Sequence, residues 1–499
     1  MTAHIASNRR HRYRRSRSRG SILTVVMLML VVVAIAGSAL LAMSALTRID
    51  MVRRSLDVRL MIAAEAALES TRGRFTLVAG VQEDWSALMP SSGWNSLGTV
   101  VVNGISCQVQ AAPVGGPEVL RARLRAIATV QSENRVVEYT IMAANFADYA
   151  LYFGGTNTVS IGEYFKMVGN FYSRGSINLH NRPGIEFYGR TETSATVMNW
   201  TDLAYNFKQG YDDNVPIIEI PPTAYGFGPM YTAAQASGTL FYSNTISIEL
   251  VGQQFVRTYR YRYTGTGSNY NHNHYQVLTE TLQIPDNSVI YIDSATPPQG
   301  VDTYSAAANG MNWAAENHLD LWGVLDERRV TIACEHEIHV VDNICYQTLL
   351  DNPNLRRYTE KQSSSALGFR EMLGVVTETD LLYETPLWNA LPYSSMVTDD
   401  AGRSPPDTGH HANQYCLDGV FMGVQKSARG AVGPATSREL WVCGGIINGN
   451  YASTLLASNF DRRNYDTDYR LQFTTPPYFL RAYGVTATQI TGTWRVYEL

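Results

Sequence analysis

The amino-acid sequence predicts a membrane-anchored α+β protein, in which a long N-terminal helix precedes a small α/β region and a mainly β body. Three observations lead to this prediction. The run Ser21–Thr47 contains no charged side chain. Apolar runs of strand length follow within residues 76–147, and from about Ala150 short strands alternate with Gly, Asn and polar turns. With 499 residues, of which 45% are hydrophobic and 17% charged, the chain can bury a sizeable core.

The predicted helix covers residues 21–75. Its uncharged first part exceeds the roughly 20 residues that span a bilayer, and it is longer than the apolar core of a cleaved signal peptide, roughly 7–15 residues. Residues 48–75 continue in good helix formers, with no proline before Pro90. This second part is amphipathic. An ordinary signal anchor with a short stalk is the alternative interpretation.

Charge is distributed unevenly along the chain. Residues 1–20 form a basic leader with seven Arg and no acidic residue, so a net charge of −4 leaves −11 on the remainder. Basic residues before an apolar span favour a cytoplasmic N-terminus, which places the body on the other side of the membrane in a single-pass topology. The acidic remainder argues against nucleic acid as a partner.

The N-terminal pattern resembles that of type IV prepilins, which combine a basic leader, a Gly-Ser step and a long apolar helix. In that family a prepilin peptidase cuts after the glycine, which here falls between Gly20 and Ser21. Major pilins carry Glu at the fifth mature position, where this chain has Val25. In lacking this Glu, and in its segment Ala63–Leu68, the chain resembles minor pilins of the PilX type. The K-type pseudopilins of type II secretion also lack this Glu.

That resemblance implies partners and a location. The partners would be the prepilin peptidase, the lipid bilayer, and other pilins or pseudopilins that contact the N-terminal helix. The location would be the bacterial inner membrane, with a periplasmic body and incorporation into a surface fibre as a further expectation. A buried carboxylate is costly unless paired, so a subunit with Val25 would insert without the contact that the Glu makes.

Residues 76–147 are predicted to form a small α/β region of the kind that lies against a pilin helix. Four apolar runs have strand length and spacing. Asn103-Gly104 separates two of them and is a strong hairpin signal. The runs are 100–102, 105–109, 120–127 and 136–142.

Residues 148–499 are predicted to form a parallel β-solenoid, interrupted by an insertion at about 195–285. Gly169 and Gly189 are 20 residues apart, and Ile161 and Leu179 are 18 apart, an imperfect period that suits stacked coils. A β-sandwich with long loops is the alternative. Three C-terminal segments, 464–471, 476–479 and 492–495, resemble the ending of large PilX-like proteins with a β-solenoid body. The resemblance does not extend to residues 195–330, whose role stays open.

A Tyr-rich hairpin is predicted at residues 257–275. Strand alternation places Tyr259, Tyr261 and Tyr263 on one face, where they would stack on a ligand or pack on the body. His272 and His274 also share a face, but no acidic or Cys ligand lies near them in the sequence.

No motif indicates catalysis, and we expect no catalytic residue, cofactor or metal site. The chain lacks a Walker A loop and a Gly-x-Ser-x-Gly elbow. The run from His336 to His339 is one residue short of H-E-x-x-H, and in a strand the two His would face opposite ways. Cysteines 334, 345, 416 and 443 would either form disulfides in an oxidising compartment or remain buried thiols, and Cys107 stands apart.

These features favour a minor pilin-like structural or assembly protein without enzymatic activity. One alternative is a membrane-tethered β-solenoid enzyme that acts on polysaccharide, which rests on fold analogy alone. Another is an adhesin that binds through the hairpin at 257–275.

Overall fold

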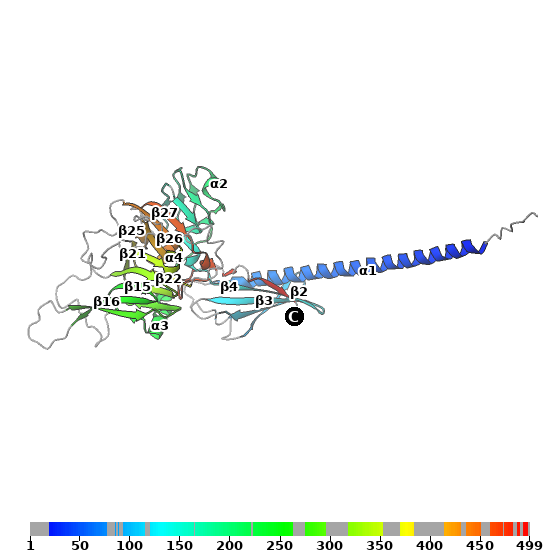
Figure 1. Ribbon diagram of the computed structural model, residues 1–499, viewed down its shortest axis with the longest axis horizontal. Coiled ribbons are helices and arrows are strands. Elements are labelled where there is room, and N and C mark those ends of the chain that lie inside the picture. Colours follow the sequence, from blue (N-terminus) through cyan, green and yellow to red (C-terminus); the bar gives the residue numbers. More distant parts are fainter. Residues whose placement is uncertain are drawn as a thin grey trace, which may run out of the picture.

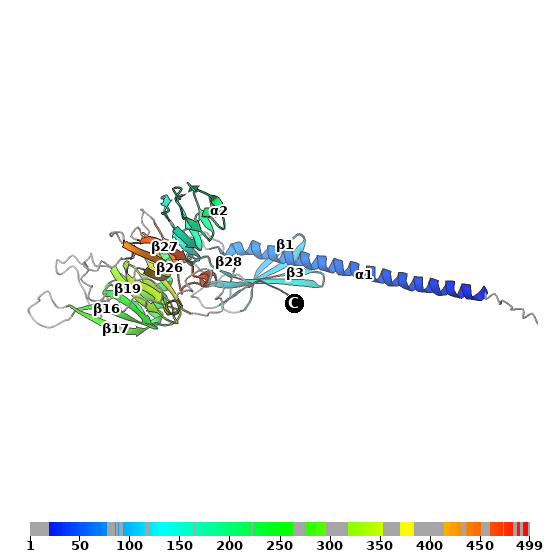
Figure 2. The same cartoon turned by 45° about the horizontal axis from the view of Figure 1, so that its top comes forward.

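The fold is described from a computed structural model. It describes residues 19–76, 85, 88, 93–114, 120–163, 165–220, 223–262, 275–295, 318–352, 370–383, 414–430, 436–450, 460–472, 474–482, 487–489 and 493–497. A long helix projects from one end of a large β-rich body, and a small antiparallel sheet lies against the part of the helix nearest the body (Figure 1, Figure 2).

Helix α1 spans Arg19–Arg72 and continues into a 3-10 turn, η1, at Gly73–Phe75. A helix of 54 residues at 1.5 Å per residue is about 80 Å long. No proline interrupts it, and its sequence is rich in Ala, Leu and Met. The predicted long helix over residues 21–75 is therefore present.

The small sheet is an antiparallel meander that packs on the second half of α1. The predicted hairpin at Asn103-Gly104 is confirmed: Val102 pairs with Ile105, and both turn residues have positive φ, 51° and 78°. Alternate residues of the second and third strands are buried towards the helix. The four strands are β1 Asn95–Val102, β2 Ile105–Pro113, β3 Arg121–Val130 and β4 Glu133–Met142.

The last described residues return to this sheet instead of ending in the body. Strands β28 (Thr488–Gln489) and β29 (Arg495–Tyr497) both pair antiparallel with β4. They complete a six-stranded sheet and cover the edge that β4 would otherwise expose. The predicted body at 148–499 is corrected here, because strand pairing places residues 488–497 with the small region.

The body begins as a stack of short parallel strands. Strands from successive segments of the chain lie side by side: Lys166 pairs with Glu186, and Phe171 with Thr191. This portion contains β5 Tyr149–Phe153, β6 Val159–Ser160, β7 Phe165–Val168, β8 Asn170–Ser173, β9 Ile177–Asn178, β10 Glu186–Phe187, β11 Thr191–Thr193, β12 Val197–Met198, helix α2 Leu203–Asn206 and β13 Tyr211–Asp212.

The insertion is predicted to begin at about residue 195, but the strand pairing shows that the parallel stack continues beyond that residue. Strand β12 pairs with β9, and β13 pairs with β11, so both continue the parallel stack. Hydrophobic spacing missed them because β12 and β13 are very short strands.

The second portion of the body resumes at the opposite end of the stack. Helix α3 (Thr223–Ser237) leads to a three-stranded antiparallel ribbon and then to further parallel strands. The strands are β14 Leu240–Phe241, β15 Thr245–Gly252, β16 Gln254–Arg262, β17 Tyr275–Gln283, β18 Ser288–Ile292, β19 His318–Leu325, β20 Arg329–Cys334, β21 Glu337–Tyr346, β22 Met372–Thr377, β23 Leu381–Tyr383, β24 Gln414–Gly423, β25 Ala428–Gly430, β26 Thr436–Asn448 and β27 Phe460–Asp466.

The two portions meet at a seam in the middle of the stack. Strand β26 pairs in parallel with β5 through Ile446 and Leu151, and β27 pairs with β7 through Tyr465 and Met167. We call the portion of the body at residues 159–212, which carries α2, the arm. Figure 1 shows the orange β26 and β27 between the arm and the yellow-green β21 and β22. The order of strands in space therefore differs from their order in the sequence.

Inward-facing apolar side chains fill the stack. One run of stacked rings passes from Phe171 to Phe187 to Phe207, with centroids 5.5 and 5.2 Å apart and interplanar angles of 5° and 11°. Phe187 and Phe207 form a parallel β-bridge, whereas Phe171 lies in β8 and pairs with Thr191. The run therefore joins rings of neighbouring segments that do not all share one register position. The three phenylalanines belong to one continuous buried cluster that extends through both portions of the body.

Candidate functional site

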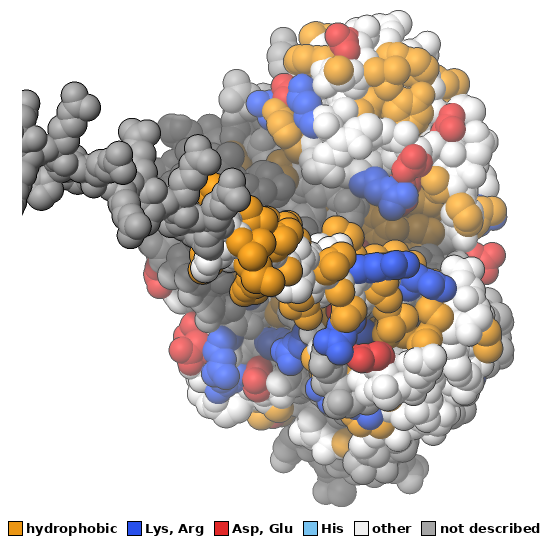
Figure 3. All heavy atoms as spheres, turned by 90° about the vertical axis from the view of Figure 1, so that its right-hand side faces the viewer, with side chains coloured by type: hydrophobic (Ala, Val, Ile, Leu, Met, Phe, Trp, Pro, Cys, Tyr) orange, Lys and Arg blue, Asp and Glu red, His pale blue; other side chains and the backbone are white. Residues whose placement is uncertain are grey.

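The first half of α1 is an exposed apolar rod. Its large apolar side chains from Ile22 to Val52 lie outside any core, and Leu41 is 74% exposed. The most apolar window has a mean hydropathy of 2.8 and is not buried anywhere. Among the described residues, α1 is the single helix whose length and apolar composition would allow it to cross a membrane. Seen end-on, hydrophobic side chains surround it (Figure 3).

The second half of α1 packs on the meander through small side chains. Ala63, Ala64 and Ala67 are at most 2% exposed, and Leu60 and Leu68 are fully buried with them. Alanine at these positions lets the helix backbone approach the sheet closely. The run Ala63–Leu68 therefore forms the seat of the helix on the sheet, that is, the surface through which the two pack together.

Polar contacts fix the helix at both ends of this seat. Near its start, Arg135 of β4 makes an ion pair with Asp57, with 2.7 Å between nitrogen and oxygen. Near its end, Tyr139 donates a hydrogen bond to Glu69 (2.9 Å), and Arg72 donates to the carbonyl of Ala487 (3.2 Å). Burial, followed by the contact with Glu69, raises the pKa of Tyr139 well above its ordinary value, so the hydroxyl stays a donor. These bonds join the helix to both the meander and the returning C-terminal segment.

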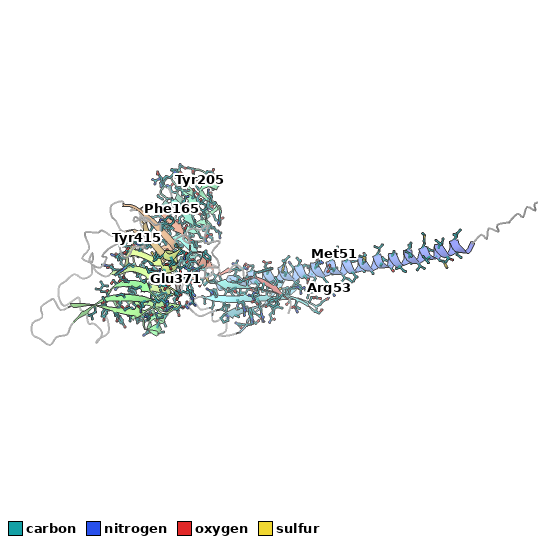
Figure 4. The ribbon with its side chains drawn as sticks, in the orientation of Figure 1. Met51, Arg53, Phe165, Tyr205, Glu371 and Tyr415 are labelled. Atoms are coloured by element: carbon teal, nitrogen blue, oxygen red, sulfur yellow. The ribbon has the colours of Figure 1, made fainter. Side chains whose placement is uncertain are left out.

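The predicted processing residues lie in the first turn of α1. Gly20 and Ser21 follow Arg19, where the helix begins. Val25, at the predicted fifth mature position, is 55% exposed on the apolar rod. Met51 and Arg53, further along, also project from the helix beyond the meander (Figure 4).

The Tyr-rich segment forms an antiparallel hairpin between β16 and β17. Tyr259 pairs with Leu278, and Tyr261 pairs with Gln276. The ring centroid of Tyr259 lies 4.3 Å from the guanidinium carbon of Arg257, which also bonds Glu280 at 2.8 Å. Tyr259 thus packs on a neighbour in its own strand. Tyr263, His272 and His274 lie outside the described residues, and for Tyr261 only the backbone is described.

An exposed aromatic surface on the arm was missed by the sequence reasoning. Trp200, Leu203 and Tyr205 are 37%, 42% and 41% exposed around α2. The amino group of Lys208 lies 4.7 Å from the Tyr205 ring centroid. Figure 4 labels Tyr205 at the tip of the arm, and the space-filling view shows apolar side chains gathered there (Figure 3). The cluster of aromatic residues at 200, 205 and 211 was a visible but unused signal.

Cysteine and histidine residues lie in structural surroundings. All five cysteines are described and buried, and none forms a disulfide. Burial raises the pKa of the Cys334 thiol to about 12. His336 lies in the bend before β21, and burial lowers its pKa. The His339 Nε2 instead lies 2.5 Å from Glu337, so His336 and His339 do not converge on one point.

Comparisons with known proteins leave the family open. No family model matches the chain, and no curated protein matches it. Among solved structures, the chain is similar to the competence-associated pilin ComZ from Thermus thermophilus, with 11% identity and a TM-score of 0.29. The alignment covers 89% of this chain and 98% of ComZ. A likeness at this level establishes neither the fold nor the family of the chain.

Proposed function

We propose that this protein is a minor type IV pilin-like structural or assembly subunit, without enzymatic activity, of a pilus or a related secretion fibre. The observation that carries the proposal is the division of α1. Its second half is seated on a sheet, whereas its first half exposes an apolar surface on every side. A rod of this kind is stable only in lipid or among other apolar helices.

The proposal includes a route and a location. The prepilin peptidase would cut between Gly20 and Ser21, and the rod would lie in the inner membrane until it joins other pilins or pseudopilins. Val25 in place of Glu supports a minor, PilX-like role, because the subunit would lack a buried carboxylate to pair with a neighbour. The periplasmic body would be an interrupted β-solenoid. Its support is the succession of parallel pairings with a regular offset.

The test is the N-terminus of the membrane-extracted chain, measured by mass spectrometry with and without the prepilin peptidase. We expect a chain that begins at Ser21 only when the peptidase is present. The variant Gly20→Val should keep its leader, because a branched side chain replaces the residue before the cut.

The matched control is Gly37→Ala in the same apolar rod. A Cβ at Gly37 would meet no atom within 4 Å, so this variant should be processed like the wild type. A leader retained by the wild type in the presence of the peptidase would refute the pilin-like route. The protein would then be an ordinary signal-anchored surface protein.

Adhesion is the second candidate function, and the position of the hairpin favours it. Strands β16 and β17 lie on the side of the body away from α1 (Figure 1, Figure 2). A binding surface there would face outward from a membrane or fibre. Replacing Tyr261 and Tyr263 by Ala should then abolish attachment to host cells or glycans while pilus assembly continues. Unchanged attachment would reject the hairpin as the adhesive surface.

A further inference from the structure

Two neighbouring parallel strands place two histidines and two carboxylates on one outer face of the body. In β19, Leu319 and Leu321 point into the core, so His318 and Asp320 lie on the other face. In β21, Ile338 and Val340 point inward in the same way, and Glu337 and His339 face outward. The register pairs His318 with Glu337, and Asp320 with His339.

The side chains of this four-residue cluster converge closely. The imidazole rings of His318 and His339 are stacked, with centroids 4.1 Å apart and an interplanar angle of 14°. The Nε2 of His339 lies 2.5 Å from Glu337, and the Nε2 of His318 lies 3.4 Å from Asp320. One ligand atom from each of His318, Asp320 and His339 lies within 4.8 Å of the other two.

We propose that His318, Asp320 and His339 bind one divalent transition-metal ion, Zn²⁺ in the first instance, with Glu337 as a fourth ligand. Imidazole with carboxylate is a ligand set that zinc accepts, whereas calcium and magnesium prefer oxygen alone. With both imidazoles neutral, the cluster carries two negative charges that a divalent cation neutralises. Asp320 is 8% exposed, so water competes weakly for its carboxylate.

Closure around an ion would require rotation of the stacked imidazole side chains, which start 4.1 Å apart between ring centroids. Bond lengths of about 2.0–2.2 Å place tetrahedral zinc ligands roughly 3.3 Å apart. The ligand atoms of His318, Asp320 and His339 lie at most 4.8 Å apart, so rotation of these side chains would have to bring them closer by about 1.5 Å. The strands already lie at the pairing distance of a sheet. The metal would act as a clamp between β19 and β21.

A neighbouring hydroxyl offers further support. Ser247 of β15 lies beside Asp320 in the parallel register, on the side away from His339. Its Oγ is buried and has no hydrogen-bond partner among the described residues. A donor at this position can orient the Asp320 carboxylate, as outer partners of metal ligands commonly do.

The test is Zn²⁺ binding by the full-length chain in detergent. After metal removal, the protein is dialysed against Zn²⁺ with a competing chelator, and bound zinc is counted by mass spectrometry. We expect one zinc per wild-type chain. His318→Gln combined with His339→Gln should weaken binding at least about 100-fold, and Asp320→Asn at least about 10-fold.

The matched controls are other histidines of this chain. His180→Gln, and His272→Gln combined with His274→Gln, should keep the stoichiometry and affinity of the wild type. Co²⁺ supplies a second readout, because its visible absorption bands report coordination. Asp320→Asn should shift these bands even if the double variant fails to fold.

Three results would overturn the proposal. Wild-type protein could bind no more zinc than a folded double variant. Loss of binding could instead follow the changes at residues 272 and 274. The Co²⁺ spectrum could be the same in the wild type and in Asp320→Asn. In each case the four side chains would form only hydrogen-bonded His–carboxylate pairs.

Discussion

Replacing Gly445 by alanine should open the seam between the two portions of the body. Gly445 lies in β26 directly before Ile446, which pairs with Leu151 of β5. A Cβ at Gly445 would lie 2.3 Å from the backbone oxygen of Tyr149. Carbon–oxygen contacts normally begin at about 3.3 Å, so the two strands must separate by about 1 Å at the centre of the stack.

The size of the expected destabilisation depends on whether the backbone oxygen of Tyr149 can move away from the new Cβ. Overpacking in a core costs about 1–3 kcal/mol, and the upper end applies here because a backbone oxygen in a paired strand cannot rotate away. About 3 kcal/mol corresponds to roughly a 100-fold change in an opening equilibrium, at about 1.4 kcal/mol per factor of ten.

Hydrogen exchange measured by mass spectrometry is the assay, because it reports local opening. Amides of β5 and of residues 446–448 should exchange about 100-fold faster in Gly445→Ala, whereas amides of the small sheet should not change. Gly73→Ala is the matched control, since a Cβ at Gly73 would meet no atom within 4 Å. Both variants replace Gly by Ala, so they restrict the unfolded chain to the same extent and differ only in the clash. Wild-type exchange at the seam of Gly445→Ala would refute the reasoning.

Two further predictions concern the helix seat and the junction between the sheet and the body. Ala67→Leu should lower the free energy of unfolding in urea by about 1–3 kcal/mol, because Ala67 is fully buried. Ala66 is exposed, so Ala66→Leu should change this free energy by less than about 0.5 kcal/mol. Equal effects of the two variants would contradict the described packing. Burial raises the pKa of Asp148 from 3.8 to about 7. Between these two pKa values the folded chain keeps a proton that the unfolded chain releases. The free energy of unfolding should therefore fall as the pH rises from 3.8 to about 7. Asp148→Asn should flatten the fall, and an unchanged pH profile would reject this assignment.

Local features of the fold were predictable from the sequence. The uninterrupted apolar run indicated α1, and Asn103-Gly104 indicated the hairpin of β1 and β2, because each depends on neighbours in the chain. The spacing of Gly169 and Gly189 indicated the offset between neighbouring parallel strands. Pairings such as Phe171 with Thr191 have the same offset.

Long-range features were not predictable in this way. The pairing of Arg495 with Glu138, and of Ile446 with Leu151, joins segments that share no local pattern. The cluster at His318 and His339 depends on the register between two strands, which a single strand's alternation does not specify. The exposed surface around Trp200 depends on where the stack ends.

The attachment of the body to the sheet has a mechanical consequence. The amide of Ala482 donates to the carbonyl of Ala144 at 2.9 Å, and Asn145 forms a β-bridge with Arg481, so the body's two connections lie side by side. Both connections reach strands at the middle of the stack, near β5 and β27. A pull transmitted along α1 would thus be shared by two adjacent chain segments. The body would be loaded at its middle, through two adjacent segments, instead of through a single strand at one end of the stack.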